Sequence, residues 1–115
     1  MTYEQLQEFL QGKVFLIGLT FIDNEGELIE QYQTHGIVSE LKDDGLIRIK
    51  RKDNSIFQMP YDKDTINKAD KGEYRLRVTN EVVIDPDFLM TWEISTNDND
   101  DLEKTKMYGY IPPNE

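Results

Sequence analysis

At 115 residues the chain has the size of one domain, and 37% hydrophobic and 10% aromatic residues suffice for one packed core rather than two. The absence of cysteine excludes disulfides, thiolate metal sites and a cysteine nucleophile. With 23 acidic residues against 13 Lys and Arg, the formal net charge is −10, which opposes approach to the phosphates of nucleic acid. We therefore expect a single soluble domain over residues 1–115.

The charge is unevenly distributed along the chain. Residues 1–40 hold seven acidic residues and one lysine, residues 41–78 hold seven acidic and ten basic residues, and residues 79–115 hold nine acidic residues and two lysines. Such asymmetry bears on encounter and choice of partner rather than on fold. Two acidic ends around a mildly basic middle predict binding to a basic protein.

The first predicted element is a helix over Tyr3–Gln11. Thr2 and Gln5 have the spacing of a capping box, an apolar stripe at helical spacing begins at Leu6, and Gly12 is typical of a helix end. This N-terminus lacks a basic segment followed by a long apolar run, so it does not read as a signal peptide. No segment reaches the roughly 18 consecutive apolar residues of a membrane span. These observations favour a cytoplasmic protein with no membrane partner.

The rest of the chain reads as a β core over about residues 14–96, followed by an edge strand and tail over about 104–115. The expected strands are Val14–Ile22, Leu28–Ser39, Leu46–Arg51, Ser55–Met59, Gly72–Val78, Val82–Ile84, Phe88–Ile94 and an edge strand at Lys104–Ile111. Gly36 is a plausible site for a bulge or sharp bend. Residues 61–71 read as a loop or a single helical turn, residues 97–101 as an acidic loop, and Pro112 and Pro113 as the end of ordered structure.

Short strands joined by turns, without repeating βα alternation, predict a mainly β fold. We expect a small, strongly bent antiparallel sheet or an SH3-like barrel with one N-terminal helix. Parallel pairing is not expected, because no crossover helix separates the strands.

Conventional catalytic or metal-binding motifs are scarce. His35 is the only histidine, and neither a nucleophile elbow nor a second histidine accompanies it. The acidic run at residues 97–101 lacks the glycine and glutamate positions of a calcium loop. Asp85 and Asp87 flank Pro86 and are typical of a turn rather than of a glycosidase pair. The sequence therefore predicts a non-enzymatic protein with no catalytic residue, no metal site and no cofactor.

Two further clusters have both a functional and a structural interpretation. The basic residues of the middle segment resemble an oligonucleotide platform, but the net charge favours their reading as partners of nearby acids: Arg48, Lys50, Arg51, Lys52, Arg75 and Arg77. Trp92, with Phe88, Met90 and Tyr74, can line an apolar groove or belong to the core.

The residues most suited to partner binding are acidic groups near both ends together with two tyrosines near the C-terminus. In a complex, the acidic groups accelerate encounter and exposed aromatic side chains anchor the interface. The predicted partner-binding residues are Glu25, Glu27, Glu30, Asp98, Asp100, Asp101, Tyr108 and Tyr110.

Five segments carry a resemblance: Thr34–Val38, Gly45–Ile49, Phe57–Pro60, Gly72–Arg77 and Asp85–Glu93. Together they resemble small uncharacterised bacterial proteins with an SH3-type β-barrel. The resemblance spans about residues 34–94 and implies a fold rather than an activity. In size, acidity and lack of a catalytic motif, the chain is also similar to bacterial immunity proteins that neutralise toxins, which implies inhibition by steric occlusion.

Two alternatives stay open at this stage. The chain can be a small-ligand binder or enzyme with a pocket near Trp92 and His35. It can also be a structural subunit that offers an uncovered strand edge at residues 104–110 to an assembly. The sequence leaves the oligomeric state undetermined.

Overall fold

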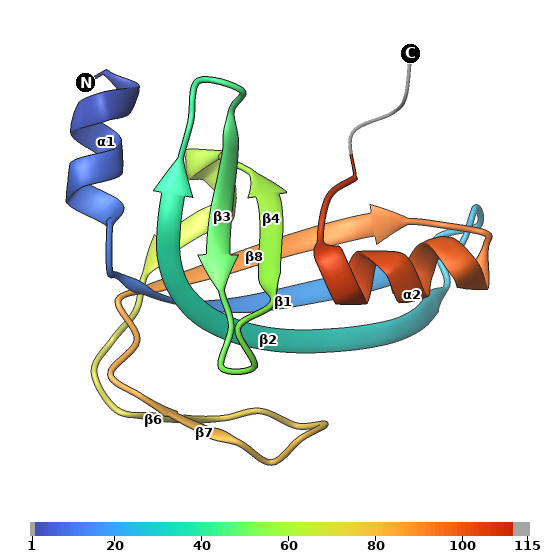
Figure 1. Cartoon of the computed structure of the whole chain (residues 1–115). Helices are drawn as coiled ribbons and strands as arrows, with labels where there is room; N and C mark the ends of the chain where they lie inside the picture. The colour runs from blue at the N-terminus through green and yellow to red at the C-terminus, as the bar shows by residue number, and fades with distance from the viewer. Residues whose placement is uncertain (1, 112–115) are drawn as a thin grey trace.

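The computed structural model describes residues 2–111 and confirms the mainly β class with an N-terminal helix (Figure 1). A second helix follows the last strand. In chain order the elements are α1 (Tyr3–Leu10), β1 (Val14–Ile22), β2 (Leu28–Leu41), β3 (Leu46–Lys50), β4 (Ile56–Pro60), the 3₁₀ turn η1 (Lys63–Thr65), β5 (Ile66–Lys68), β6 (Glu73–Arg75), β7 (Val82–Ile84), β8 (Phe88–Ser95) and α2 (Asn99–Tyr108). The predicted end of order at Pro112 and Pro113 lies outside the described residues.

Helix α1 forms where its sequence signals predict. The Thr2 hydroxyl accepts a hydrogen bond from the Gln5 amide at 3.1 Å, and the Gln5 side chain accepts one from the Thr2 amide at 2.9 Å. The capping box thus satisfies two amides that lack helical partners. The helix is one residue shorter than predicted, because Gln11 is its C-cap, and Leu10 carries its apolar stripe into the core.

Six strands form one mixed sheet in the order β4-β3-β2-β1-β8-β5, and β6 pairs with β7 in a separate ribbon. The expectation of a purely antiparallel sheet is wrong at one place, because β8 runs parallel to β1. The parallel pairing is set by the hydrogen bonds of the residue that precedes β8. Asp87 donates its amide to the Val14 carbonyl and accepts from the Val14 amide, so both strands start side by side.

The sheet bends strongly but stays open, so the barrel alternative does not describe it. Strand β2 pairs with β1 through its first part and with β3 from Ile37 onward, and it curves between the two (Figure 1). Gly36 lies at this change of partner, where an added Cβ would be 2.5 Å from the Lys50 carbonyl oxygen. A bulge or sharp bend was predicted at Gly36; the irregular pairing lies slightly later, between Val38 and Glu40.

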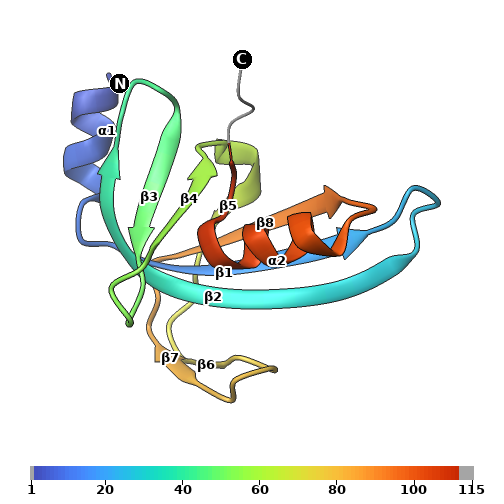
Figure 2. The same cartoon turned by 45° about the vertical axis from the view of Figure 1, so that its right-hand side comes forward.

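The main core joins side chains of the sheet to Leu10 of α1 and Leu102 of α2, and α2 lies across the bent sheet in Figure 2. A smaller cluster of Leu16, Leu76 and Val83 lies apart from it, where the β6–β7 ribbon packs against β1. The strand predicted over Gly72–Val78 is correspondingly too long. The chain turns at residues 77–79, which leaves Val78 71% exposed.

The predicted edge strand at Lys104–Ile111 is wrong, because most of that segment belongs to α2. Asp98 caps the helix by accepting from the Asp100 amide at 2.8 Å, and acidic residues in the first turn complement the helix dipole. Leu102 is buried in the main core, and Gly109 ends the helix with φ +79°. The only β pairing of this segment within residues 2–111 is an isolated bridge between Gly109 and Gln58.

Candidate interaction site

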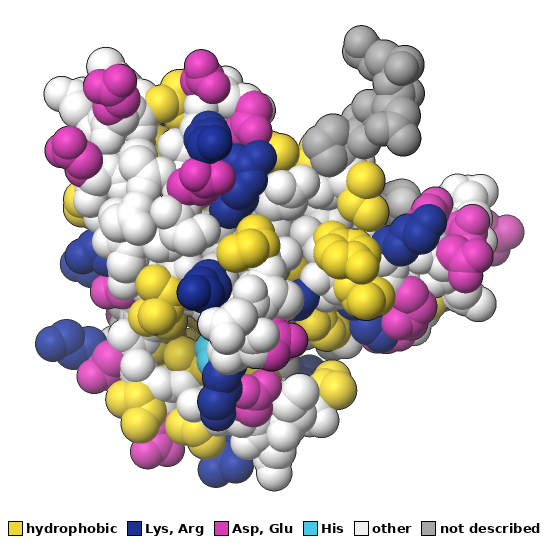
Figure 3. Space-filling view, in the orientation of Figure 1, with side chains coloured by type: hydrophobic (Ala, Val, Ile, Leu, Met, Phe, Trp, Pro, Cys, Tyr) yellow, Lys and Arg dark blue, Asp and Glu magenta, His cyan; other side chains and the backbone are white. Residues whose placement is uncertain are grey.

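The fold brings the two acidic segments of the chain together at one end of the molecule. The β1–β2 turn lies beside the connection from β8 to α2, where the Thr96 amide donates to the Ile22 carbonyl at 2.9 Å. Figure 3 shows acidic side chains at this end of the molecule, and others around α1 at the opposite end. We call this surface the acidic end and define it by Glu25, Glu27, Asp98, Asp100 and Asp101.

The carboxylates of this region divide into structural and free groups. Asp23 accepts from the Glu25 and Glu27 amides, each at 2.9 Å, and thereby fixes the β1–β2 turn. Asp98 has the comparable role at the start of α2. The carboxylates of Glu25, Glu27, Asp100 and Asp101 make no ion pair or hydrogen bond within residues 2–111. Their charge is available to a partner.

Glu30 belongs to a different environment from the other predicted acids. Its carboxylate lies 2.7 Å from Lys106 Nζ, and Glu103 lies 3.3 Å from the same ammonium. The hydrogen bond that Lys106 donates to Glu30 is the largest influence that raises the pKa of Lys106 above its ordinary value of 10.5, although burial acts in the opposite sense. Glu30 therefore joins α2 to β2 and adds little to the acidic surface.

Arg51 holds the other end of α2 against the sheet. Its guanidinium donates to the carbonyls of Lys106, at 3.1 Å, and Met107, and it stacks 5.1 Å from the centre of the Phe57 ring. A cation at these terminal carbonyls also complements the helix dipole. Tyr108 ends the helix here and is 53% exposed, at the opposite end of α2 from Asp100 and Asp101.

A groove of about 720 Å³ runs between β8, the end of β4 and α2. We call it the β8 groove; its lining residues include Pro60, Trp92, Ile94, Asp101, Lys104 and Tyr110. Trp92 and Ile94 also pack partly against the main core. The indole N–H of Trp92 is buried and has no hydrogen-bond partner in the described structure. Of the two tyrosines predicted to bind a partner, Tyr110 lines this groove. Asp101 belongs both to the groove lining and to the acidic end.

Trp92 and His35 line different hollows. His35 Nε2 lies 3.3 Å from a Glu81 carboxylate oxygen, near Arg51 and Lys106. The contact with His35, followed by that with the Thr79 hydroxyl, holds the pKa of Glu81 below its ordinary value of 4.5. The contact joins β2 to the turn before β7.

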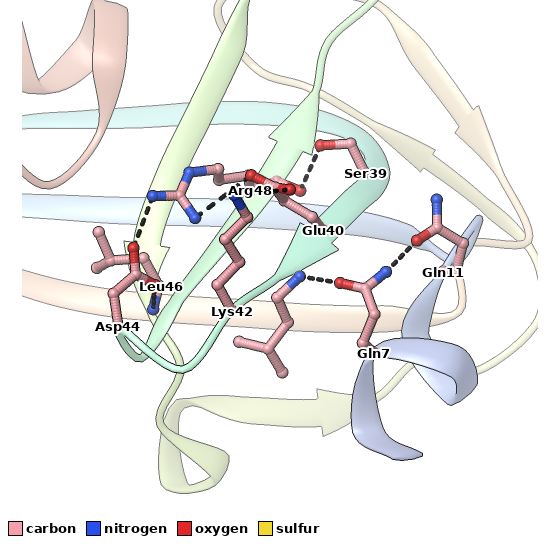
Figure 4. Close-up of polar contacts among 9 residues, drawn as sticks. Gln7, Gln11, Ser39, Glu40, Lys42, Asp44, Leu46 and Arg48 are labelled. Atoms are coloured by element: carbon pink, nitrogen blue, oxygen red, sulfur yellow. Dashed lines mark hydrogen bonds and ion pairs between the residues drawn. The ribbon is translucent and has the colours of Figure 1, made fainter. Parts of the chain in front are cut away.

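Three of the six basic residues singled out in the middle segment make side-chain contacts within the described residues: Arg48, Arg51 and Arg75. Figure 4 shows Arg48 between Asp44 and Glu40. Its guanidinium lies 2.8 Å from the Asp44 carboxylate and 3.5 Å from the Glu40 carboxylate. Hydrogen bonds from Arg48 and then from the Leu46 amide hold the pKa of Asp44 below 3.8. In the same view, Gln7 of α1 accepts from the Leu41 amide and so joins the helix to this corner of the sheet.

The remaining candidates have structural positions. Asp87 bonds to Val14 as described above, and Asp85 accepts from the Gly72 amide at 2.7 Å. Tyr74 packs against the small Leu16 cluster rather than beside Trp92. Within residues 2–111, no group of three or more His, Asp or Glu side chains is arranged to hold a metal ion.

Sequence reasoning missed the docking role of Arg51 and the helical caps of α2. The capping signal was present, since Asp98 precedes two acids and Gly109 follows a basic last turn. None of the helices in the described residues is long and apolar enough to cross a membrane. Comparison of the chain with protein-family models, curated proteins and solved structures finds no match.

Proposed function

We propose that the protein is a non-enzymatic interaction module that binds a basic protein partner through its acidic end. The observation that carries this proposal is the meeting of two acidic segments, about 70 residues apart in sequence, on one surface. No Lys or Arg occurs in residues 14–41 or 78–103, so the strands leading to this surface bring no compensating basic side chain.

The mechanism is electrostatic steering followed by steric occlusion. Four free carboxylates on one surface attract a basic partner over roughly one Debye length, about 8 Å at physiological ionic strength. Steering of this kind raises association rates by about 10- to 1,000-fold and weakens as salt increases. Tyr110 and Trp92 lie beside the acidic end and supply aromatic contact area.

An inhibitor of the immunity type fits this description. It needs a stable scaffold and a charged face, and it needs no catalytic group. The resemblance to proteins with an SH3-type barrel stays a prediction, and the six-stranded sheet is not closed into a barrel. A cytoplasmic location is part of the proposal, because a partner of this kind is met inside the cell.

The proposal is tested by affinity capture of the tagged protein from its native cells at low and moderate salt, with mass spectrometry of the bound proteins. Glu25→Gln with Glu27→Gln removes two free charges of the acidic end. Glu4→Gln with Glu8→Gln removes two exposed charges from α1 and is the matched control. We expect one basic protein in about equal amount with the wild type and the control, and much less with the acidic-end variant.

A further inference from the structure

The far part of β8 has an uncovered backbone edge. Strand β5 covers β8 only from Phe88 to Met90, whereas β1 pairs with β8 along the whole strand to Ser95. No other strand among residues 2–111 pairs with β8 on the side of β5 beyond Met90. Figures 1 and 2 both show β8 running beside β1 toward the connection to α2.

The hydrogen-bond pattern identifies the unpaired groups. The Thr96 amide points toward β1, since it donates to the Ile22 carbonyl, and backbone groups of successive strand residues point to opposite edges. Trp92 and Ile94 therefore direct their backbone groups to β1. The backbone groups of Glu93 and Ser95 point to the opposite edge of β8. This is the edge on which the Ala69 amide donates to the carbonyl of Asp87, just before the start of β8. Exposed groups of this kind are a template for an added strand.

The side chains beside this edge determine which residue types an added strand needs. Trp92 and Ile94 face the core side and line the β8 groove, so one face of the occupant meets apolar surface. Glu93 is exposed on the other face of β8. Among the residues that line the groove, Asp101 belongs to α2, Lys104 is the only cation, and Glu93 belongs to β8 with its side chain on the face opposite to Trp92. Opposite charges on neighbouring strands attract, so the other face of the occupant is basic.

We propose that the β8 edge binds an extended segment of a partner, with alternating apolar and basic residues, as an added strand in line with β5. The apolar side chains lie in the β8 groove and the basic ones beside Glu93. This inference deepens the proposed function, on which the choice of a basic partner rests. Two copies of the chain paired at this edge would instead bring together two molecules with net charge −10 each.

The test uses a nine-residue peptide of alternating valine and lysine with blocked ends. Trp92 is the only tryptophan of the chain and lines the groove, so its fluorescence reports binding there. The control peptides are the valine and glutamate version and a valine and lysine version N-methylated at alternate residues, which cannot form a strand on the methylated edge. We expect saturable binding of the first peptide and at least tenfold weaker binding of both controls.

Ser95→Pro removes one outward amide without changing charge and, at the end of an edge, without breaking the β1 ladder. The variant loses that hydrogen bond, and the proline ring keeps an added strand from approaching closely. Together these effects are expected to weaken peptide binding about tenfold. Lys68→Pro removes an amide from the outer edge of β5, away from the proposed site, together with one positive charge. Because the loss of a cation does not weaken binding of a basic peptide, this variant should bind at least as tightly as the wild type. Thermal melts of both variants establish that they fold.

Three outcomes overturn the inference: no binding to the folded wild type, equal binding to Ser95→Pro, or self-association in sedimentation that Ser95→Pro abolishes. Failure of the proposed function is separately visible. If the acidic-end variant loses its captured protein while Ser95→Pro binds the peptide normally, strand addition is wrong and the interaction module stands. If the peptide behaves as expected but no basic protein is captured, only the proposed function fails.

Discussion

Gly109 is the residue on which the position of the C-terminal segment depends. It has φ +79° and ψ −142°, a region that is essentially restricted to glycine. An added Cβ would lie 2.0 Å from the Gln58 carbonyl oxygen, which itself accepts the Tyr110 amide at 2.7 Å. Gly109→Ala therefore imposes both backbone strain and a clash with β4.

The magnitude follows from a matched position. Gly12 has the same φ of +79°, but an added Cβ there would meet no atom within 4 Å. Gly12→Ala is expected to destabilise the fold by about 1–2 kcal/mol, the usual cost of a left-handed conformation for alanine. Gly109→Ala adds an overpacking cost of about 1–3 kcal/mol because the obstructing atoms are backbone. The total is about 2–5 kcal/mol.

Urea unfolding followed by Trp92 fluorescence measures both variants on one scale. We expect a clearly lower midpoint for Gly109→Ala than for Gly12→Ala. We also expect the Trp92 fluorescence of the native state to change in Gly109→Ala and not in Gly12→Ala, since Tyr110 lines the β8 groove with Trp92. Equal midpoints would refute the argument that the close approach of Gly109 to β4 determines this position.

Three other predictions concern the contacts that hold the fold. Arg51→Ala should lower the free energy of unfolding by about 2 kcal/mol through lost bonds to the end of α2, measured by urea titration; no loss would contradict the docking role. Leu102→Ala should cost about 2–4 kcal/mol by the same assay, because the side chain is 3% exposed in the main core. The lowered pKa of Asp44 stabilises the native state above its ordinary value of 3.8, and this stability is lost as pH falls through the native pKa. Asp44→Asn should therefore be less stable than the wild type at neutral pH and equal to it in strong acid; a constant difference in thermal midpoints would refute this.

Local signals were sufficient for α1 and for most strands. The capping box at Thr2, the apolar run Val14–Ile22 and the turn glycines each act through neighbours in sequence, so pattern alone locates them. The special position of Gly36 was also predictable, because an interior strand glycine often marks the close approach of another backbone.

The predictions were wrong where contacts between residues far apart in sequence determine the structure. The parallel pairing of β8 depends on the bonds between Asp87 and Val14, which no local pattern reveals. Helix α2 has weak amphipathic character, and its docking through Leu102 and Arg51 requires the concave sheet to exist first. The β8 edge is exposed only because β5 stops pairing at Met90. The acidic character of the site was readable from composition, whereas its assembly at one end of the molecule required the fold.

The central claim is that the acidic end selects a basic partner. The most direct measurement is the association rate of the captured partner with the wild type, with Glu25→Gln/Glu27→Gln and with Glu4→Gln/Glu8→Gln, across a series of salt concentrations. The account predicts a rate that falls steeply with salt for the wild type and the α1 control, and a lower, flatter dependence for the acidic-end variant. Identical salt dependence for all three proteins would contradict it.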